Sequence, residues 1–217
     1  MKFKIKSWIT GKVIITLEGE NFKAAFMTAF AAGQRFEYAD LSGMDLSKLN
    51  IKFGCFYGTK FYGTTFDGTK FDGTKFDGTK FDGTTFYGTK FDGTKFDGTK
   101  FYGTTFDGTK FDGTTFDGTK FDGTTFYGTT FKRTCFAGKE IVDCARPIFA
   151  IHPLGSEQRT MYAVLTKKGI HILTGCFSGS VDEFKAAIEK KHGDNAHDQE
   201  YLAALTLVEL HFKLWGK

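Results

Sequence analysis

One stretch of this chain constrains its fold more than any other. Phenylalanine recurs at every fifth position from Phe56 to Phe136, and the residues between follow a nearly fixed order of Asp or Tyr, Gly, Thr, then Lys or Thr. A short period repeated many times is typical of a solenoid, in which each unit stacks on its neighbours because it cannot bury its apolar side chain alone. The sequence therefore predicts stacked coils with the phenylalanines inside.

The predicted core is the phenylalanine column of the most uniform units. Its members are Phe61, Phe66, Phe71, Phe76, Phe81, Phe86, Phe91, Phe96, Phe101, Phe106, Phe111, Phe116, Phe121 and Phe126. Rings that repeat along a stack can lie offset on one another at the spacing of neighbouring strands.

The substitutions within the repeat indicate how many sides each coil has. Thr replaces Lys before the Phe at Thr65, Thr85, Thr105 and Thr125. Tyr replaces Asp after the Phe at Tyr62 and Tyr102, and again at Tyr87 and Tyr127. Spacings of twenty and forty residues fit four units per coil and do not fit three. We also interpret the tyrosines as separators of like-charged Asp neighbours along a column.

The units resemble those of the pentapeptide repeat family, which read small residue, variable, Leu or Phe, variable, variable. Ala39-Asp40-Leu41-Ser42-Gly43 fits that pattern, and so does Thr69-Lys70-Phe71-Asp72-Gly73. The resemblance covers about half the chain, from Phe36 to Ile141. It implies a right-handed quadrilateral β-helix, with each Phe and the Thr two residues before it facing inward.

The Gly and Thr of each unit have physical roles in such a coil. A four-sided coil must turn a corner every five residues, and Gly tolerates the positive φ that a type II turn requires. The hydroxyl of an inward Thr needs a hydrogen-bond partner, which we expect in the backbone of a neighbouring coil.

Residues 1–33 are expected to form an N-terminal cap. Alternating apolar residues predict a β-hairpin over residues 1–18, and a helix follows at 22–32, capped by Asn21 and ended by Gly33. The apolar face of this helix is Phe22, Ala25, Phe26, Ala29 and Phe30. A solenoid needs a cap because its end coil exposes apolar side chains and unpaired strand edges.

The repeat domain is predicted to span residues 34–146, and a C-terminal α+β cap to span 147–217. Arg146-Pro147 marks the boundary because Pro suits the end of a ladder. The expected elements of the cap are a strand at 148–152, a turn at 153–156, and a hairpin from 161–165 and 169–173. The fold class is therefore mainly β, a β-helix between an N-terminal hairpin and helix and a C-terminal α+β cap.

Two helices should complete the C-terminal cap. Ser180-Val181-Asp182-Glu183 is a capping box that opens a helix through Lys191. Asp194 or Asn195 caps a last helix that runs to Trp215. Its expected apolar positions are Leu202, Leu205, Val208, Leu210, Phe212 and Trp215.

The same segment is similar to a module at the end of various phage-encoded proteins of unknown function. The residues that carry this resemblance are Gly175-Cys176-Phe177-Ser178-Gly179, Phe184, His192-Gly193-Asp194-Asn195 and His197. The resemblance brings no catalytic residues with it.

A catalytic or metal site would most plausibly use Cys176, His171, His192 and His197. The alternative is that His192, Asp194 and Asn195 close one helix and cap the next, and we favour it because His192 and His197 lie five apart across a Gly-containing turn. His211 is expected to be a packed or surface histidine, and Glu157 and Arg159 to flank a turn. The chain has no phosphate-binding loop and no nucleophile elbow. We expect no enzyme activity, no cofactor and no metal.

Composition indicates in which cellular compartment the chain is expected and which kinds of partner it could bind. The four cysteines match no zinc pattern, so we expect free thiols in a reducing cytosol. No apolar run is long enough for a membrane span, and the start does not fit a signal peptide. The net charge of +4 is modest because Lys and Asp nearly cancel in the repeat, a solvated surface of mixed sign.

These features favour a structural role. Units this uniform indicate a consensus or engineered array, and the alternative is a recent expansion of one unit in a natural gene. The predicted function is a non-enzymatic scaffold or designed model of the fold, with no evident partner, as a monomer or weak homodimer.

The resemblance implies an alternative, a DNA-mimicking binder of gyrase or another type II topoisomerase. Mimicry requires a strongly acidic surface, whereas Lys here is as regular as Asp. Nucleic-acid binding is equally disfavoured, since the Asp rows repel phosphate.

Overall fold

A computed structural model of the chain describes residues 1–144, 146–155, 159–193 and 195–216, with the side chains of residues 122 and 192 left aside. The chain divides into two compact units, Met1–Thr129 and Thr130–Lys217. The first unit contains the hairpin, one helix and most of the coils. The second contains the end of the repeat and the α+β segment.

The first unit begins with the hairpin and helix that the sequence predicts. Strands β1 (Lys2–Lys6) and β2 (Val13–Glu18) pair antiparallel. Helix α1 (Phe22–Ala31) begins at Asn21, whose side chain accepts a hydrogen bond from the backbone N–H of Ala24. Gly33 follows the helix with a φ of +80°. Local propensity and capping thus suffice to predict this segment.

Helix α1 and the hairpin lie against the first coils. The ring of Phe26 lies 4.6 Å from the ring of Phe36, centroid to centroid, and Phe26 is fully buried. The Trp8 indole N–H donates a 2.6 Å hydrogen bond to the carbonyl oxygen of Gly58. These contacts cover apolar side chains that an open first coil would expose to water.

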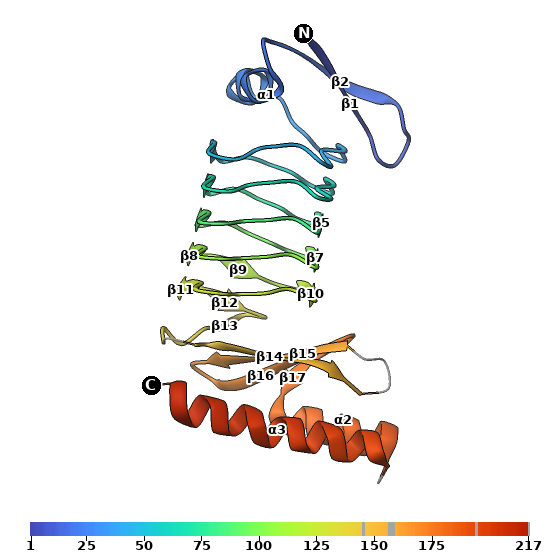
Figure 1. Ribbon diagram of the computed structural model, residues 1–217, viewed down its shortest axis with the longest axis vertical. Helices are drawn as coiled ribbons and strands as arrows, with labels where there is room; N and C mark the ends of the chain where they lie inside the picture. Colours follow the sequence, from blue (N-terminus) through green and yellow to red (C-terminus); the bar gives the residue numbers. More distant parts are fainter. Residues whose placement is uncertain (145, 156–158, 194, 217) are drawn as a thin grey trace. The chain divides into compact units, whose positions relative to one another are not determined.

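The coils have four sides, as the spacing of the substitutions predicts. Side B carries β5 (Lys80–Asp82), β7 (Lys100–Tyr102) and β10 (Lys120–Asp122), which pair in parallel with each residue opposite the one twenty positions on. Side D carries β3 (Asn50–Lys52), β4 (Lys70–Asp72), β6 (Lys90–Asp92) and β8 (Lys110–Asp112) in the same register. Figure 1 shows β5, β7 and β10 along one edge of the stack and β8 on the opposite edge.

The other two sides are joined more sparsely. Side A carries Phe56, Phe76, Phe96 and Phe116, and side C carries Phe66, Phe86, Phe106 and Phe126. On these sides successive coils are joined by single β-bridges, such as Cys55 to Lys75 on side A and Thr65 to Thr85 on side C. The exception is the two-residue strand β9 (Thr115–Phe116) on side A. The chain closes hydrogen-bonded turns on these sides, since the backbone N–H of Thr69 donates to the carbonyl of Phe66 at 2.9 Å.

The interior is a set of stacked phenyl columns. Phe86 lies between Phe66 and Phe106, at centroid distances of 5.2 Å and 5.0 Å and with nearly parallel rings. Neighbouring sides meet edge to face, as Phe61 and Phe66 do at 69°. The phenylalanines from Phe61 to Phe116 are at most 1% exposed, whereas Phe121 and Phe126, in the last coil of the unit, are half-buried. Burial of this area in offset and edge-to-face pairs stabilises the stack.

The inward threonines find the partners that the sequence leads one to expect. The hydroxyl of Thr59 donates to the carbonyl of Phe36 at 2.6 Å, and the hydroxyl of Thr79 to that of Phe56 at 2.7 Å. The offset of 23 residues places each acceptor in the preceding coil. The buried hydroxyls therefore tie coil to coil instead of remaining unsatisfied.

The second unit contains short strands of the repeat and then an antiparallel sheet. The short strands are β11 (Thr130–Lys132), β12 (Cys135–Phe136) and β13 (Lys139–Glu140), of which β12 and β13 pair antiparallel. The sheet has the order β14 (Ile148–Leu154), β15 (Arg159–Thr166), β16 (Gly169–Thr174), β17 (Phe177–Ser180). The predicted hairpin is confirmed as β15 and β16. Strand β17 was not expected.

Two helices follow the sheet. Helix α2 (Val181–His192) begins with the predicted capping box of Ser180 and Glu183. Helix α3 (Ala196–Trp215) begins at Asn195, which confirms one of the two expected caps, while Asp194 lies outside the described residues. Phe184 and Ile188 of α2 pack with Leu205 and Val208 of α3 and with Ala163 and Ile172 of the sheet in one core.

Two expectations for this unit were wrong. Pro153 lies within β14 and not in a turn, since β14 runs on to Leu154, where it pairs with Arg159. Leu202, Leu210 and Trp215 are 40%, 49% and 45% exposed. The buried residues of α3 recur at positions 204, 205, 208 and 212, which form one face of the helix, and Leu202 and Leu210 lie off that face. Trp215 lies on the same face but at the last residue of the helix, where the Arg146 guanidinium lies 4.2 Å from the centre of its ring.

Candidate interaction surface of the coils

The outward side chains before each Phe form columns of different chemistry. Side B presents Lys60, Lys80, Lys100 and Lys120, and side D presents Lys70, Lys90 and Lys110. Side A presents Lys75 and Lys95, and side C presents Thr65, Thr85, Thr105 and Thr125. The in-register pairing of every coil with the next places these side chains one above another. On sides B, C and D the column thus repeats one chemistry at the spacing of neighbouring strands, whereas on side A Cys55 precedes the two Lys residues and Thr115 follows them.

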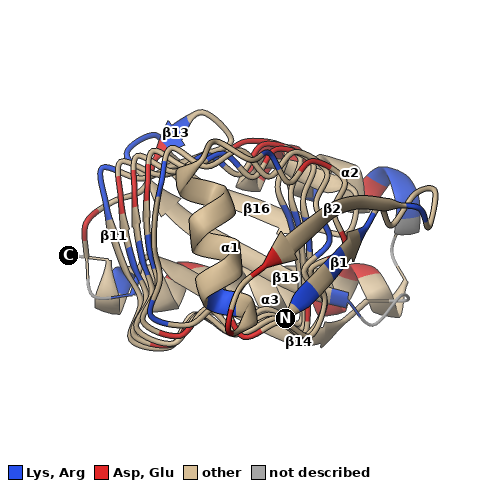
Figure 2. Cartoon of the chain, turned by 90° about the horizontal axis from the view of Figure 1, so that it is seen from above, with Lys and Arg blue, Asp and Glu red and all other residues tan. Residues whose placement is uncertain are grey.

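Acidic and tyrosine side chains follow each Phe in a second set of columns. On side B Tyr62, Asp82 and Tyr102 alternate, since the N–H of Gly63 bonds the carbonyl of Asp82 and Asp82 lies opposite Tyr102. On side C the order is Asp67, Tyr87, Asp107, Tyr127, fixed by the same kind of backbone bond. Figure 2 shows basic and acidic positions next to each other along part of the stacked coils, so that part of the surface carries both signs of charge.

Tyrosines stand between Asp neighbours on sides B and C but not on side D. On side D Asp72 lies opposite Asp92, and Asp92 opposite Asp112, with no Tyr between them. A column of like charges therefore forms without separation, beside the Lys column of the same strands. The tyrosines are then not required for the coils to form.

Local contacts on side B hold several of these side chains in place. Lys60 Nζ lies 4.3 Å from the centre of the Tyr62 ring, and Lys80 Nζ 4.1 Å from that of Trp8, both cation–π contacts. Burial, more than the charges of Asp82 and Asp40, raises the pKa of Tyr62. Lys60 is also 4.0 Å from Asp40, an exposed pair that stabilises little.

On side C the carboxylate of Asp67 reaches the next coil. Its Oδ1 accepts hydrogen bonds at 3.1 Å from the hydroxyl of Thr85 and from the backbone N–H of Tyr87. Asp67 thus serves as a bridge between two coils, which is a structural use of an outward acidic residue.

The described histidines and cysteines of the C-terminal segment lie apart from one another or have structural partners. Within the part of the chain that the structure describes, no group of three His, Cys, Asp or Glu side chains could hold a metal ion. All four cysteines are unpaired, and Cys176 is exposed. Glu157 and the side chain of His192 lie outside the described residues. His197 Nδ1 lies 4.0 Å from Glu200 on the surface of α3.

Two other histidines have structural partners. His171 is buried between Lys139, whose Nζ lies 3.0 Å from Nδ1, and Ser178, whose Oγ lies 2.9 Å from Nε2. Burial, and then the charge of Lys139, lowers the pKa of His171, so the neutral ring is favoured. His211 stacks on Phe149 at 4.2 Å, and burial lowers its pKa too.

Sequence reasoning gave Arg159 no role beyond the edge of a turn. In the structure Arg159 begins β15 and lines a cavity together with Lys191 of α2 and Tyr201 of α3. No motif could have revealed this grouping, because the three residues come from separate elements.

Comparison with known proteins identifies the repeat. Residues 56–100 and 91–138 match the sequence profile of the family described as Pentapeptide repeats (9 copies). A search of curated proteins found no match. The predicted likeness of the C-terminal segment to a phage-encoded module stays a prediction.

Several solved structures are similar to part of this chain. They include HetL, a pentapeptide repeat protein involved in heterocyst differentiation regulation from the cyanobacterium Nostoc sp. strain PCC 7120, with 14% identity, a TM-score of 0.49, and coverage of 54% of this chain and 49% of that one. Rfr23, from the cyanobacterium Cyanothece 51142, has 12% identity, a TM-score of 0.41, and coverage of 51% and 96%. QnrB1, a plasmid-mediated fluoroquinolone resistance protein, has 23% identity, a TM-score of 0.36, and coverage of 42% and 48%. The chain spans about half the length of HetL and of QnrB1.

Proposed function

Since residues 56–138 are pentapeptide repeats stacked as a four-sided β-helix, we propose that this chain is a non-enzymatic structural scaffold whose coils hold no specific ligand. The observation that carries the proposal is the contrast between the inside and the outside of the coils. Inside, the Phe and Thr columns repeat almost without change. Outside, the columns differ from side to side and mix Lys, Asp, Thr and Tyr.

Such a pattern fits selection for the fold more than selection for a partner. A binding surface concentrates one potential or a few aromatic anchors in one place. Here Lys70, Lys90 and Lys110 follow the same strands as Asp72, Asp92 and Asp112, so opposite charges run side by side on side D. We infer that the uniform units are a consensus array, optimised for stacking.

The same charge balance disfavours the alternative, a DNA-mimicking binder of DNA gyrase or another type II topoisomerase. A mimic of duplex DNA has to present rows of negative charge without interruption, and the Lys columns interrupt them on sides A, B and D. Direct binding of nucleic acid is disfavoured for the converse reason, because Asp rows repel phosphate beside every Lys row. No helix in the described part of the chain is long and apolar enough to cross a membrane.

We also propose three functional parts: a cap at residues 1–33, the repeat at 34–146 and a second cap at 147–217. The contact of Phe26 with Phe36 supports the first cap, since it covers a ring of the first coil. A β-helix whose first coil is covered in this way is able to remain a monomer or a weak homodimer, because the apolar side chains of that coil are not open to another molecule.

A supercoiling assay with DNA gyrase and titrated protein tests the proposal. We expect no inhibition at high micromolar concentrations. A variant with Lys60, Lys80 and Lys100 changed to Glu makes side B acidic and serves as the matched control, since it shows whether charge alone converts the coils into an inhibitor. Potent inhibition by the unmodified chain would instead support the gyrase-binding alternative.

A coil deletion tests the scaffold role itself. Removal of residues 80–99 brings Lys100 to the place of Lys80, where it pairs with Lys60 in the same register. We expect a folded chain that is shorter by one coil. A deletion of similar size that is not a multiple of five residues moves Phe out of the interior and should abolish cooperative unfolding.

A further inference from the structure

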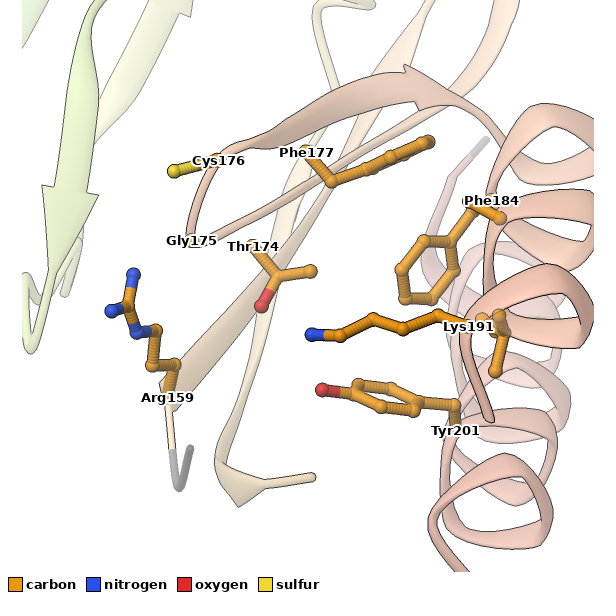
Figure 3. A pocket seen from close by; sticks show the side chains of 10 residues that line it. Arg159, Thr174, Gly175, Cys176, Phe177, Phe184, Lys191 and Tyr201 are labelled. Atoms are coloured by element: carbon orange, nitrogen blue, oxygen red, sulfur yellow. The ribbon is translucent and has the colours of Figure 1, made fainter. Parts of the chain in front are cut away.

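The antiparallel sheet of the second unit buries different residues on its two faces. On one face Ala163 and Ile172 pack in the core that the sheet shares with helices α2 and α3. Phe177 of β17 points toward Phe184 of α2 on that side, as Figure 3 shows. His171 lies on the other face, because successive residues of a strand point to opposite sides of a sheet. It is 3% exposed there, so a titratable ring is buried on the side away from both helices.

Strand β13, which follows the last repeat units, lies against this part of the sheet. The backbone N–H of Lys167, in the turn between β15 and β16, donates to the carbonyl of Glu140 at 2.8 Å, and their side chains form an ion pair at 2.8 Å. Lys139, the first residue of β13, reaches the ring of His171, with 3.0 Å between Nζ and Nδ1. The ring of His171 therefore ties the end of the repeat to the sheet.

The two contacts of the His171 ring require its neutral form. An ammonium group can only donate, so Nδ1 has to accept from Lys139. The proton of the neutral ring then lies on Nε2, which donates to Oγ of Ser178 at 2.9 Å. A second proton, on Nδ1, would turn the acceptor into a donor and place two cations 3.0 Å apart at a buried site. A charged His171 ring and the Lys139 contact thus exclude each other.

Among the described residues, the acidic group that acts on the ring is Glu183 of α2. Its charge raises the pKa of His171, but less than burial and then the lysine charge lower it. The Glu183 carboxylate is also engaged at the start of α2, where it accepts from the backbone N–H of Ser180 at 2.7 Å. Val164 and Ser180 lie opposite His171 on the neighbouring strands, and Tyr162 of β15 shares its face. These three side chains carry no charge near neutral pH.

We propose that Lys139, His171 and Ser178 form an acid-sensitive clasp between the end of the repeat and the antiparallel sheet. At neutral pH and above, the uncharged ring holds Lys139 and with it β13. In mild acid the ring gains a proton, Lys139 leaves its half-buried place for solvent, and β13 loosens from the sheet. The clasp goes beyond the scaffold role and does not depend on it, since all its residues lie in the second unit.

The direction of the pH effect follows from the folded and unfolded states of the ring. Burial, and then the charge of Lys139, lowers the pKa of His171 in the folded chain below its ordinary value of 6.5. The unfolded or opened chain therefore binds the proton more readily than the closed one. The stabilisation by the clasp is complete above the unfolded pKa and is lost as the pH falls from there through the folded pKa.

Hydrogen exchange of the full chain tests the proposal, with rates corrected for the intrinsic effect of pH. The probe is the backbone amide of Lys167, which donates to Glu140 of β13. Between pH 7.5 and pH 5.5 its protection should fall by about tenfold, the change expected when opening exposes a ring with a pKa of about 6.5. The amide of Lys90, which donates to Thr69 in the coils of the first unit, should keep its protection.

Two histidine variants separate the clasp from the other buried ring of this unit. In His171→Gln the amide oxygen can accept from Lys139 and the amide nitrogen can donate to Ser178, but the side chain does not titrate, so the fall in protection should vanish. His211→Gln is the matched control. Burial lowers the pKa of His211 as well, but its ring stacks on Phe149, so the fall should persist in this variant.

Lys139→Met supplies a second readout that does not rely on exchange. It should raise the pKa of His171, followed by the ring proton shifts in an NMR titration, because burial is then the remaining cause that lowers it. The fall in Lys167 protection should shrink as well. Three results would each overturn the proposal: equal protection at both pH values in the unmodified chain, a fall that survives His171→Gln, or a pKa of His171 that Lys139→Met leaves unchanged.

Discussion

The hydroxyl of Thr89 donates a 2.7 Å hydrogen bond to the carbonyl oxygen of Phe66 in the preceding coil. That carbonyl also accepts from the backbone N–H of Thr69 at 2.9 Å, which closes the turn on side C. Thr94, which follows side D, differs: its hydroxyl lies 3.4 Å from the carbonyl oxygen of Asp92, two residues before it in the same coil. Identical five-residue units therefore have unequal hydrogen bonds, according to the side on which they fall.

This inequality predicts unequal effects of the same substitution. Thr89→Val should lower the free energy of unfolding by about 1 kcal/mol, since a well-formed buried hydrogen bond is lost. Thr94→Val should change it by less than about 0.5 kcal/mol, because the hydroxyl that it removes bonds weakly and the new methyl is buried. Denaturant unfolding of both variants measures the difference. Equal losses would show that the two hydroxyls contribute alike.

The stacked rings predict a large effect at Phe86. Phe86→Ala should cost about 3 to 5 kcal/mol, as truncation of a buried Phe does, because the rings of Phe66 and Phe106 lose the partner between them. Tyr127→Ala is the matched control. Tyr127 is 78% exposed, so its loss should stay within about 0.5 kcal/mol. A small effect at Phe86 would mean that the columns collapse around the missing ring.

The corner glycines predict strain where another residue takes their place. Lys48 has a φ of +60°, at the position that Gly88 fills two coils later with a φ of +59°. Lys48→Gly should stabilise the chain by about 1 kcal/mol, since an L-residue in the left-handed region costs roughly 1 to 2 kcal/mol. Gly88→Ala should destabilise it by a similar amount, because open space surrounds the new Cβ and only the backbone is strained. Thermal unfolding of the two variants should move in opposite directions.

The alternation on side C predicts an effect that depends on salt. Tyr87→Asp places a carboxylate between Asp67 and Asp107 in the column, and each like-charged neighbour should destabilise by about 0.2 to 1 kcal/mol. The loss should shrink in 1 M salt, where the screening length falls to about 3 Å. Tyr87→Asn removes the ring without adding charge. An identical loss for both variants at all salt concentrations would contradict repulsion as the cause.

The ion pair between helix α1 and the first coil predicts a dependence on pH. Asp45 Oδ2 lies 2.8 Å from Lys23 Nζ, and the hydrogen bond from Lys23, followed by those from Ser47, lowers the pKa of Asp45 to about 2. The stabilisation is therefore present above the unfolded pKa of about 3.9 and is lost as the pH falls through the folded value of about 2. Because Asp45 is largely exposed, Asp45→Asn should cost less than about 1 kcal/mol at pH 7 and nothing below pH 2. Lys23→Met should show the same pH profile if the pair is the cause.

Much of the fold follows from periodicity alone. The spacing of Thr65, Thr85 and Thr105 fixes four sides, and the hydrogen bonds of the inward Thr follow from the need to satisfy a buried hydroxyl. The distinction between sides with paired strands and sides with closed turns could not be predicted. The inward Phe and Thr and the corner Gly are the same on all four sides, and the difference arises only when the coil closes on itself.

The second unit was harder to predict because its pattern is not periodic. Strand β17 is Phe-Ser-Gly-Ser, a composition more typical of a loop, and it becomes a strand by pairing with β16. Leu202 and Leu210 were expected to be buried because they are apolar, but the single buried face of α3 has room for Leu205 and Val208 instead. The cavity was missed because Arg159, Lys191 and Tyr201 meet only through tertiary packing.

The uniform interior leaves the alignment of one coil on the next degenerate. A slip of one whole unit still places Phe on Phe and Thr inside, so the core does not distinguish the native alignment from a slipped one. Only residues that break the repeat can do so. The bond from Trp8 to Gly58 and the ion pair of Lys23 with Asp45 each fix a definite number of residues between the N-terminal segment and the coils. These few irregular contacts therefore set the position of the first coils, and with it the alignment of every coil that stacks on them.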